Sequence, residues 1–120
     1  MSKIIYSENA PQPLGPYSQA ILAGNTLYCS GQIAAGHLDG DISKQTEYAC
    51  ENLKAVLEAA GMTLENVVKT TCFLANMEDF AVFNFVYDRY FQNKPARSCV
   101  AAKQLPKGAL VEIEVTAIKE

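Results

Sequence analysis

Apolar residues recur along this chain with two different periods, and each period predicts one type of element. In residues 43–60 they are spaced by three or four positions, which places them on one stripe of a helix. The stripe consists of Ala49, Leu53, Val56, Leu57 and Ala60. Gly61 follows as a C-terminal stop, so the pattern predicts a helix that begins near Ser43 and ends before this glycine.

A second stripe at helical spacing is mainly aromatic. It contains Phe80, Phe83, Tyr87, Tyr90 and Phe91. Asn76 can cap this element, and Asn93 and Pro95 end it. The rings give the predicted helix a strongly apolar face, which must pack against another layer.

Strands are predicted where β-branched and aromatic residues gather or where apolar and polar residues alternate. The predicted strands are residues 3–6, 17–23, 26–33, 67–74, 97–102 and 110–118. Gly24-Asn25 joins the second and third strands as a tight hairpin. Residues 10–16 are rich in proline and cannot form a helix, and residues 34–40 are predicted to be a loop.

This order of elements predicts the α+β class, with one mixed sheet and both helices packed side by side on one of its faces. The other face of the sheet would then lack cover. We expect an oligomer to provide it, because copies related by a symmetry axis would bury the open face and form clefts between subunits.

The amino-acid composition further restricts the kind of protein and the partners that it can have. The chain has 120 residues, of which 49% are hydrophobic and 19% charged, as is typical of a single globular domain spanning residues 1–120. A net charge of -3 with scattered lysines argues against nucleic acid as a partner. No segment has the length and hydrophobicity of a membrane span, and the four cysteines lack paired spacing. We therefore expect a soluble protein of the cytoplasm.

Candidate chemistry lies near the C-terminus. Arg97 follows Pro95 at the start of a predicted strand, and a guanidinium carries a rigid fork of donors that fits a carboxylate two-pronged. In the last predicted strand alternate residues face opposite sides, so Glu112 and Glu114 share its polar face. Taken alone, such an arginine is more often a structural ion-pair residue, and such glutamates are more often a solvated face. Arg97 nevertheless indicates an anion-binding site.

Two other residues have an ordinary interpretation as well as a functional one. Cys99 lies near Arg97, but no histidine supports it as a nucleophile, so a small buried side chain whose removal has a mild effect is expected. Tyr17, taken alone, is a packing aromatic more often than a site residue. The remaining cysteines are predicted core residues and, with the single histidine His37 in a loop, predict no metal site: Cys29, Cys50 and Cys72.

Six motifs taken together resemble the RidA/YjgF family. In chain order they are Gly15-Pro16-Tyr17-Ser18-Gln19, Ser30-Gly31-Gln32-Ile33, Asn52-Leu53-Lys54, Lys69-Thr70-Thr71, Pro95-Ala96-Arg97-Ser98-Cys99-Val100 and Val111-Glu112-Ile113-Glu114. They extend over nearly the whole chain. The resemblance implies a chorismate-mutase-like domain assembled as a homotrimer, with three clefts between neighbouring subunits.

The resemblance also implies a hydrolase acting on C=N bonds. RidA-type members hydrolyse short 2-imino acids, released by pyridoxal-phosphate-dependent dehydratases, to 2-oxo acids and ammonia. By position, Arg97 would hold the substrate carboxylate, and Glu112 would orient a water and accept its proton. Tyr17 would wall the cleft, and the cradle would be completed by Gly31, Cys99 and Asn84. No metal or other cofactor is implied, because a protonated imine is already a good electrophile.

Two features leave the substrate range open, and two alternative functions remain beside the hydrolase. Ala34 stands where many relatives have proline, and the loop from His37 to Gly40 carries little bulk near the expected cleft rim. A regulatory protein that binds a 2-oxo acid in the same Arg97 cleft, without turnover, is one alternative. An endoribonuclease that inhibits translation is the other, and it is disfavoured because the chain has no paired histidines and no lysine-rich groove.

Overall fold

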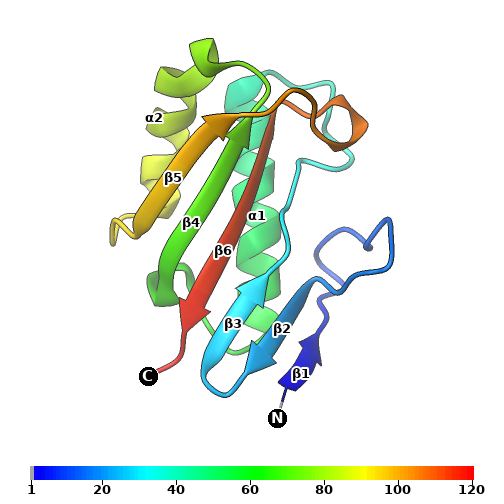
Figure 1. Cartoon of the computed structure of the whole chain (residues 1–120), viewed down its shortest axis with the longest axis vertical. Helices are drawn as coiled ribbons and strands as arrows, with labels where there is room; N and C mark the ends of the chain where they lie inside the picture. The colour runs from blue at the N-terminus through cyan, green and yellow to red at the C-terminus, as the bar shows by residue number, and fades with distance from the viewer. Residues whose placement is uncertain (1) are drawn as a thin grey trace.

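The computed structural model describes residues 2–120 as one six-stranded mixed sheet with two helices on a single face (Figure 1). The strands are β1 Ser2–Ile5, β2 Ala20–Ala23, β3 Thr26–Cys29, β4 Val67–Leu74, β5 Ala96–Ala101 and β6 Val111–Ile118, and the helices are α1 Ile42–Ala59 and α2 Phe80–Tyr90. Across the sheet the strands lie in the order β1-β2-β3-β6-β4-β5. The predicted α+β class and the predicted order of elements are confirmed.

The strand pairing places Arg97 at one edge of the sheet. All neighbouring strands are antiparallel except β4 and β5, which run parallel. A parallel pair requires a crossover connection, and α2 provides it. β5 is therefore an edge strand lying beside α2, and its Arg97 is the register partner of Thr70 in β4.

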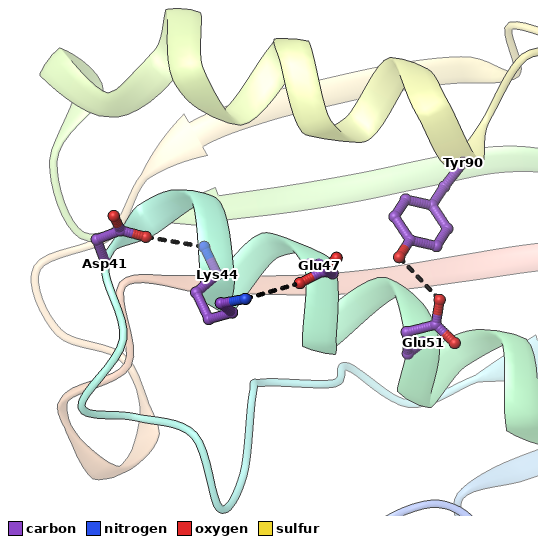
Figure 2. Close-up of polar contacts among 5 residues, drawn as sticks. All are labelled: Asp41, Lys44, Glu47, Glu51 and Tyr90. Atoms are coloured by element: carbon purple, nitrogen blue, oxygen red, sulfur yellow. Dashed lines mark hydrogen bonds and ion pairs between the residues drawn. The ribbon is translucent and has the colours of Figure 1, made fainter.

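Local chemistry fixes both ends of α1. The Asp41 carboxylate accepts a hydrogen bond from the amide of Lys44 at 2.9 Å and caps α1 (Figure 2). Gly61, with φ of +74°, ends the same helix in the left-handed region, as predicted. Across the helix pair, the Tyr90 hydroxyl donates to the Glu51 carboxylate at 2.8 Å.

The core lies between the sheet and the helices, and the predicted stripes contribute much of it, although Phe80 and Tyr90 of the aromatic stripe are only partly buried. On β6 the buried side chains alternate with partly or fully exposed ones, which confirms the predicted two-residue period. The buried residues of these three elements include Ala49, Leu53, Val56 and Leu57 of α1, Phe83 and Tyr87 of α2, and Val111, Ile113, Val115 and Ala117 of β6. Asn76, the predicted cap, precedes a short 3-10 turn, Met77–Asp79, that leads into α2.

Two predicted strands were too long. The prediction for residues 17–23 is wrong at its start, because the Tyr17 amide donates to the carbonyl of Gly15 in a turn and β2 begins only at Ala20. The prediction for residues 26–33 is wrong at its end, because β3 stops at Cys29. Pairing resumes at a single bridge between Gln32 and Ile113, after one extra residue has been inserted relative to β6.

The face of the sheet opposite the helices is open. Its exposed side chains include large apolar ones, such as Tyr28 and Val100, alongside the carboxylate of Glu114. No helix within residues 2–120 has the length and hydropathy that a bilayer crossing requires. The uncovered face that the sequence predicts is thus present in the single chain.

Candidate functional site

Arg97 lies half-buried between the edge of the sheet and α2. One of its terminal amino groups, Nη1, donates a hydrogen bond to Oδ1 of Asn84 at 2.8 Å. Its Cζ atom lies over three aromatic rings of the same helix, 4.9 Å from the centroid of Tyr87, 5.5 Å from that of Phe80 and 5.7 Å from that of Phe83. We call these three rings the aromatic clamp.

The guanidinium keeps most of its donors free. It has five N–H groups, and one is used by Asn84. Within residues 2–120 the ion pairs closer than 4 Å are Lys44–Glu47 and Lys94–Asp88, so no carboxylate of the described chain neutralises Arg97. The side chain borders a hollow of about 450 Å³ together with Asn84 and with Asp88 and Lys94, which form an ion pair with each other. A half-buried cation with a free donor edge is suited to a small carboxylate.

Glu112 projects from the opposite face of the sheet. It is half-buried and lines a second hollow of about 430 Å³ with Tyr17, Gly31 and apolar residues such as Leu14 and Ile33. Burial raises the pKa of this carboxyl above its ordinary value, and the nearby charge of Glu114 raises it further. A carboxylate with a raised pKa is better matched to proton transfer near neutral pH.

Gly31 is required by the position of the Glu112 side chain. A Cβ atom built on Gly31 would lie 2.5 Å from Oε2 of Glu112, closer than any ordinary contact. The glycine falls in the irregular stretch between Cys29 and the bridge at Gln32, where the chain passes over β6. The insertion in this stretch and the missing side chain together make room for Glu112.

The loop that carries Tyr17 is held by a buried glutamine. Gln19 accepts a hydrogen bond from the amide of Ser7 at 2.6 Å and donates to the carbonyls of Ser7 and Pro11. Tyr17 itself is 48% exposed, and its hydroxyl accepts a hydrogen bond from the amide of Leu14 at 3.3 Å. The proline-rich loop is thus fixed at its base, with Tyr17 on the wall of the Glu112 hollow.

The predicted site residues fall into two groups. Arg97 and Asn84 lie together on the helix side of the sheet, whereas Tyr17, Gly31 and Glu112 lie together on the other side. The two hollows share no lining residue. One chain therefore does not bring Arg97 and Glu112 into a common site.

Cys99 is half-buried on the same side of β5 as Arg97. Burial raises the pKa of its thiol, and the Arg97 charge offsets part of that effect. The thiols of Cys29 and Cys72 are buried, and burial raises the pKa of each to about 12. The thiols of Cys29 and Cys72 are therefore protonated at neutral pH. Cys50 is buried as well, so all three predicted core cysteines are buried.

The aromatic clamp and Gln19 were missed by the sequence analysis. Phe80, Phe83 and Tyr87 had been assigned only to an apolar helix face. A polar, half-buried Asn84 at the margin of that aromatic stripe was the available signal, because a partly buried polar side chain needs a partner. Gln19 gave no such signal, since its partners are backbone groups of a distant loop.

Comparisons with known proteins agree over nearly the full length of the chain. Residues 7–119 match the model of a family described as Endoribonuclease L-PSP. A RutC family protein of Pyrococcus horikoshii is 52% identical over 126 residues, which cover 100% of both chains. A 2-iminobutanoate/2-iminopropanoate deaminase of Escherichia coli is 41% identical over 127 residues, covering 99% of both. The crystal structure of E. coli TdcF with bound serine has a TM-score of 0.93 and 36% identity, covering 98% of this chain and 99% of that one.

Proposed function

The chain belongs to the RidA/YjgF family, and from this premise we propose that it is a 2-iminobutanoate/2-iminopropanoate deaminase. It would hydrolyse reactive 2-imino acids, the products of pyridoxal-phosphate-dependent dehydratases, to 2-oxo acids and ammonia. The E. coli relative named for this reaction is 41% identical over almost the whole chain. The four free cysteines, three of them buried, favour a reducing compartment, and we propose the cytoplasm.

The observation that carries the proposal is the free donor edge of Arg97. A 2-imino acid presents a carboxylate next to its electrophilic carbon, and a guanidinium can hold that carboxylate through two parallel hydrogen bonds. Asn84 and the aromatic clamp fix Arg97 without occupying that edge. The substrate would therefore be held in one orientation, with its C=N carbon at a fixed distance from the charge.

Hydrolysis needs a positioned water and a proton acceptor. In the proposed reaction Glu112 accepts a proton as the water oxygen bonds to the C=N carbon of the protonated imine, giving a carbinolamine. Glu112 then returns the proton to the nitrogen. As the C–N bond breaks, Glu112 accepts the proton of the carbinolamine hydroxyl group, so that the C=O bond forms and ammonia and the 2-oxo acid leave. Glu112 finally passes this proton to ammonia or to solvent, which restores the carboxylate. Tyr17 closes the wall of the hollow, and backbone groups at Gly31 and Cys99 complete the cradle. The reaction as proposed uses no metal or cofactor, because the imine is itself electrophilic.

We propose that the complete site lies between two copies of the chain in a homotrimer. Arg97 and Glu112 act on the same small substrate in this mechanism, yet they project from opposite faces of the sheet. A cleft that receives Arg97 from one subunit and Glu112 from its neighbour resolves this separation, and the open face of the sheet supplies surface for the contact.

A coupled assay tests the activity. Threonine dehydratase with threonine generates 2-iminobutanoate, and semicarbazide traps the imine that has not been hydrolysed. The deaminase should increase the rate of 2-oxobutanoate release and reduce the trapped fraction. An unchanged trapped fraction, at protein concentrations that bind 2-oxobutanoate, would contradict the enzyme and favour the regulatory protein.

Mixing two inactive variants tests the shared cleft. When Arg97→Ala and Glu112→Gln chains are co-expressed, each mixed trimer contains one cleft that receives an intact residue from each variant. Random assembly should restore about one quarter of the wild-type rate, since three quarters of the trimers are mixed and each has one active cleft in three. Each variant purified alone is the control. No recovery in verified mixed trimers would place both residues in the same subunit's site or outside any common site.

The same proteins and assays distinguish two other functions from the deaminase. Binding of 2-oxobutanoate without faster imine loss would identify a regulatory protein, an option supported by the relative whose structure contains bound serine. An endoribonuclease is the description attached to the matching family model. Cleavage of RNA by the purified wild-type protein, lost in Arg97→Ala, would favour that activity over the deaminase.

A further inference from the structure

The aromatic clamp around Arg97 follows from the helical period of α2. Phe80, Phe83 and Tyr87 are separated by three and four positions, so their rings project from one stripe toward the sheet. Asn84 lies one turn after Phe80, at the margin of the same stripe, and supplies the polar contact to the guanidinium. One short helix thus provides both the side-chain hydrogen bond and the three ring contacts of the Arg97 guanidinium.

Tyr87 is the ring of the clamp that carries a hydrogen bond as well as being buried. It is 8% exposed, and its hydroxyl is hydrogen-bonded to Oγ1 of Thr70 at 2.7 Å within the buried core. Thr70 is fully buried and is the register partner of Arg97 across the β4–β5 pair. The residue that neighbours Arg97 in the sheet therefore fixes the ring that lies nearest to its charge.

Ring faces and carboxylates hold an arginine in different ways. A carboxylate bonds to the edge of the guanidinium and uses the same N–H groups that a substrate carboxylate would need. An aromatic face attracts the charge through its quadrupole and uses no N–H group. Since no carboxylate of residues 2–120 lies within ion-pair distance of Arg97, the surroundings restrain its charge and leave its donors open.

We propose that Tyr87, fixed by its hydrogen bond to Thr70, is a positioning residue that holds the Arg97 guanidinium in place for carboxylate binding, with Phe80 and Phe83 as secondary restraints. The inference rests on the proposed function for the identity of the ligand. The restraint on Arg97 is independent of the proposed function, because it exists in the protein without a ligand.

The restraint is measured on the free protein by the ¹H–¹⁵N resonance of Arg97 Nε. Nearby ring faces shift this proton by their ring currents and slow its exchange with water. In Tyr87→Leu the resonance should move toward the random-coil position and broaden, whereas in Tyr87→Phe, which keeps the ring but loses the Thr70 bond, the shift should be partial. An unmoved resonance in folded Tyr87→Leu would overturn the proposal.

Tyr90 provides a matched control on the same helix. Its hydroxyl is also hydrogen-bonded to a side chain, the Glu51 carboxylate (Figure 2). Its ring, however, is not among those that lie over Arg97. Tyr90→Leu and Tyr90→Phe should lower stability without moving the Arg97 resonance. If Tyr87→Leu does not fold, Phe80→Leu replaces it, because Phe80 is only partly buried and its loss should give a smaller shift in the same direction.

Ligand binding then connects the restraint to function. The dissociation constant of 2-oxobutanoate, measured by calorimetry, should rise roughly tenfold in Tyr87→Leu and remain unchanged in Tyr90→Leu. In an Arg97→Ala background the Tyr87→Leu change should add nothing, because Tyr87 acts through Arg97. Independent, additive losses would overturn the proposal. A Tyr87-dependent Arg97 resonance in a protein without deaminase activity would refute the proposed function and leave this inference standing.

Discussion

Arg97 and Glu112 stand on opposite faces of one sheet, and the surroundings that fix them differ in kind. Arg97 is restrained by a helix that is packed on the core, through Asn84 and the rings beneath the charge. Glu112 faces a hollow formed by a proline-rich loop and the irregular stretch at Gly31. The half proposed to bind the carboxylate is therefore built from regular, internally packed structure. The half proposed for proton transfer places Glu112 of β6 against loops on the face that lacks cover.

The largest effect should come from the binding half. Arg97→Ala should lower kcat/KM for imine hydrolysis roughly 1,000-fold, to the uncatalysed background, because two charge-assisted hydrogen bonds worth about 4 kcal/mol in total are lost. The fold should remain intact, since Arg97 lies at the sheet edge. Arg89→Ala is the matched control, as Arg89 is exposed on α2. The coupled imine assay measures the loss, and full retention of the rate would refute the anchor.

Replacing Glu112, in the other half of the site, should lower turnover without weakening ligand binding. Glu112→Gln should lower kcat roughly 100-fold, the usual contribution of a general base, while the dissociation constant of 2-oxobutanoate stays within about twofold of wild type. Glu114→Gln, on the same strand and face, should retain most of the activity. Equal losses of turnover and 2-oxobutanoate binding would show that Glu112 is only a structural or binding group.

The regular parts of both halves could be predicted because they follow local periods. The stripe of α1 and the alternation of β6 each require only neighbouring residues along the chain, and Val67–Leu74 agrees with the predicted strand at both ends. The resemblance to known motifs supplied the candidate residues, including Asn84, whose contact with Arg97 no local pattern contains.

The remaining features depend on contacts between distant segments. The end of β3 was missed because the chain leaves the regular strand pairing where it passes the side chain of Glu112, which is 81 positions after Gly31. The aromatic clamp was missed because the period of α2 predicts a buried stripe but not what that stripe covers. Only the β4–β5 register places Arg97 beside Thr70 and over the face of the Tyr87 ring.

A smaller effect should follow from filling the space at Gly31. Gly31→Ala places a Cβ atom against the Glu112 carboxyl group, so the side chain must move, and kcat should fall roughly tenfold. The φ angle of Gly31 is outside the left-handed region, so an alanine introduces no backbone strain there. Gly24→Ala is the opposite control: it strains the backbone in a hairpin turn and should lower stability, with activity unchanged. A full rate in Gly31→Ala would mean that the position of Glu112 does not matter.

The smallest effect concerns the pH at which Glu112 loses its charge. As a general base Glu112 must be ionised, so kcat/KM should fall as the pH decreases through its pKa. Burial and the Glu114 charge both raise this pKa, which places the acid limb above the ordinary range of a glutamate. In Glu114→Gln the repulsion that favours the protonated form is removed, the pKa of Glu112 falls, and the acid limb should move to lower pH with little change on its plateau. The shift is read from pH–rate profiles of both proteins, with Glu78→Gln, an exposed glutamate before α2, as the control for net charge. An acid limb that stays in place would mean that the titrating group is not Glu112, and the two halves of the site would then have to be reassigned.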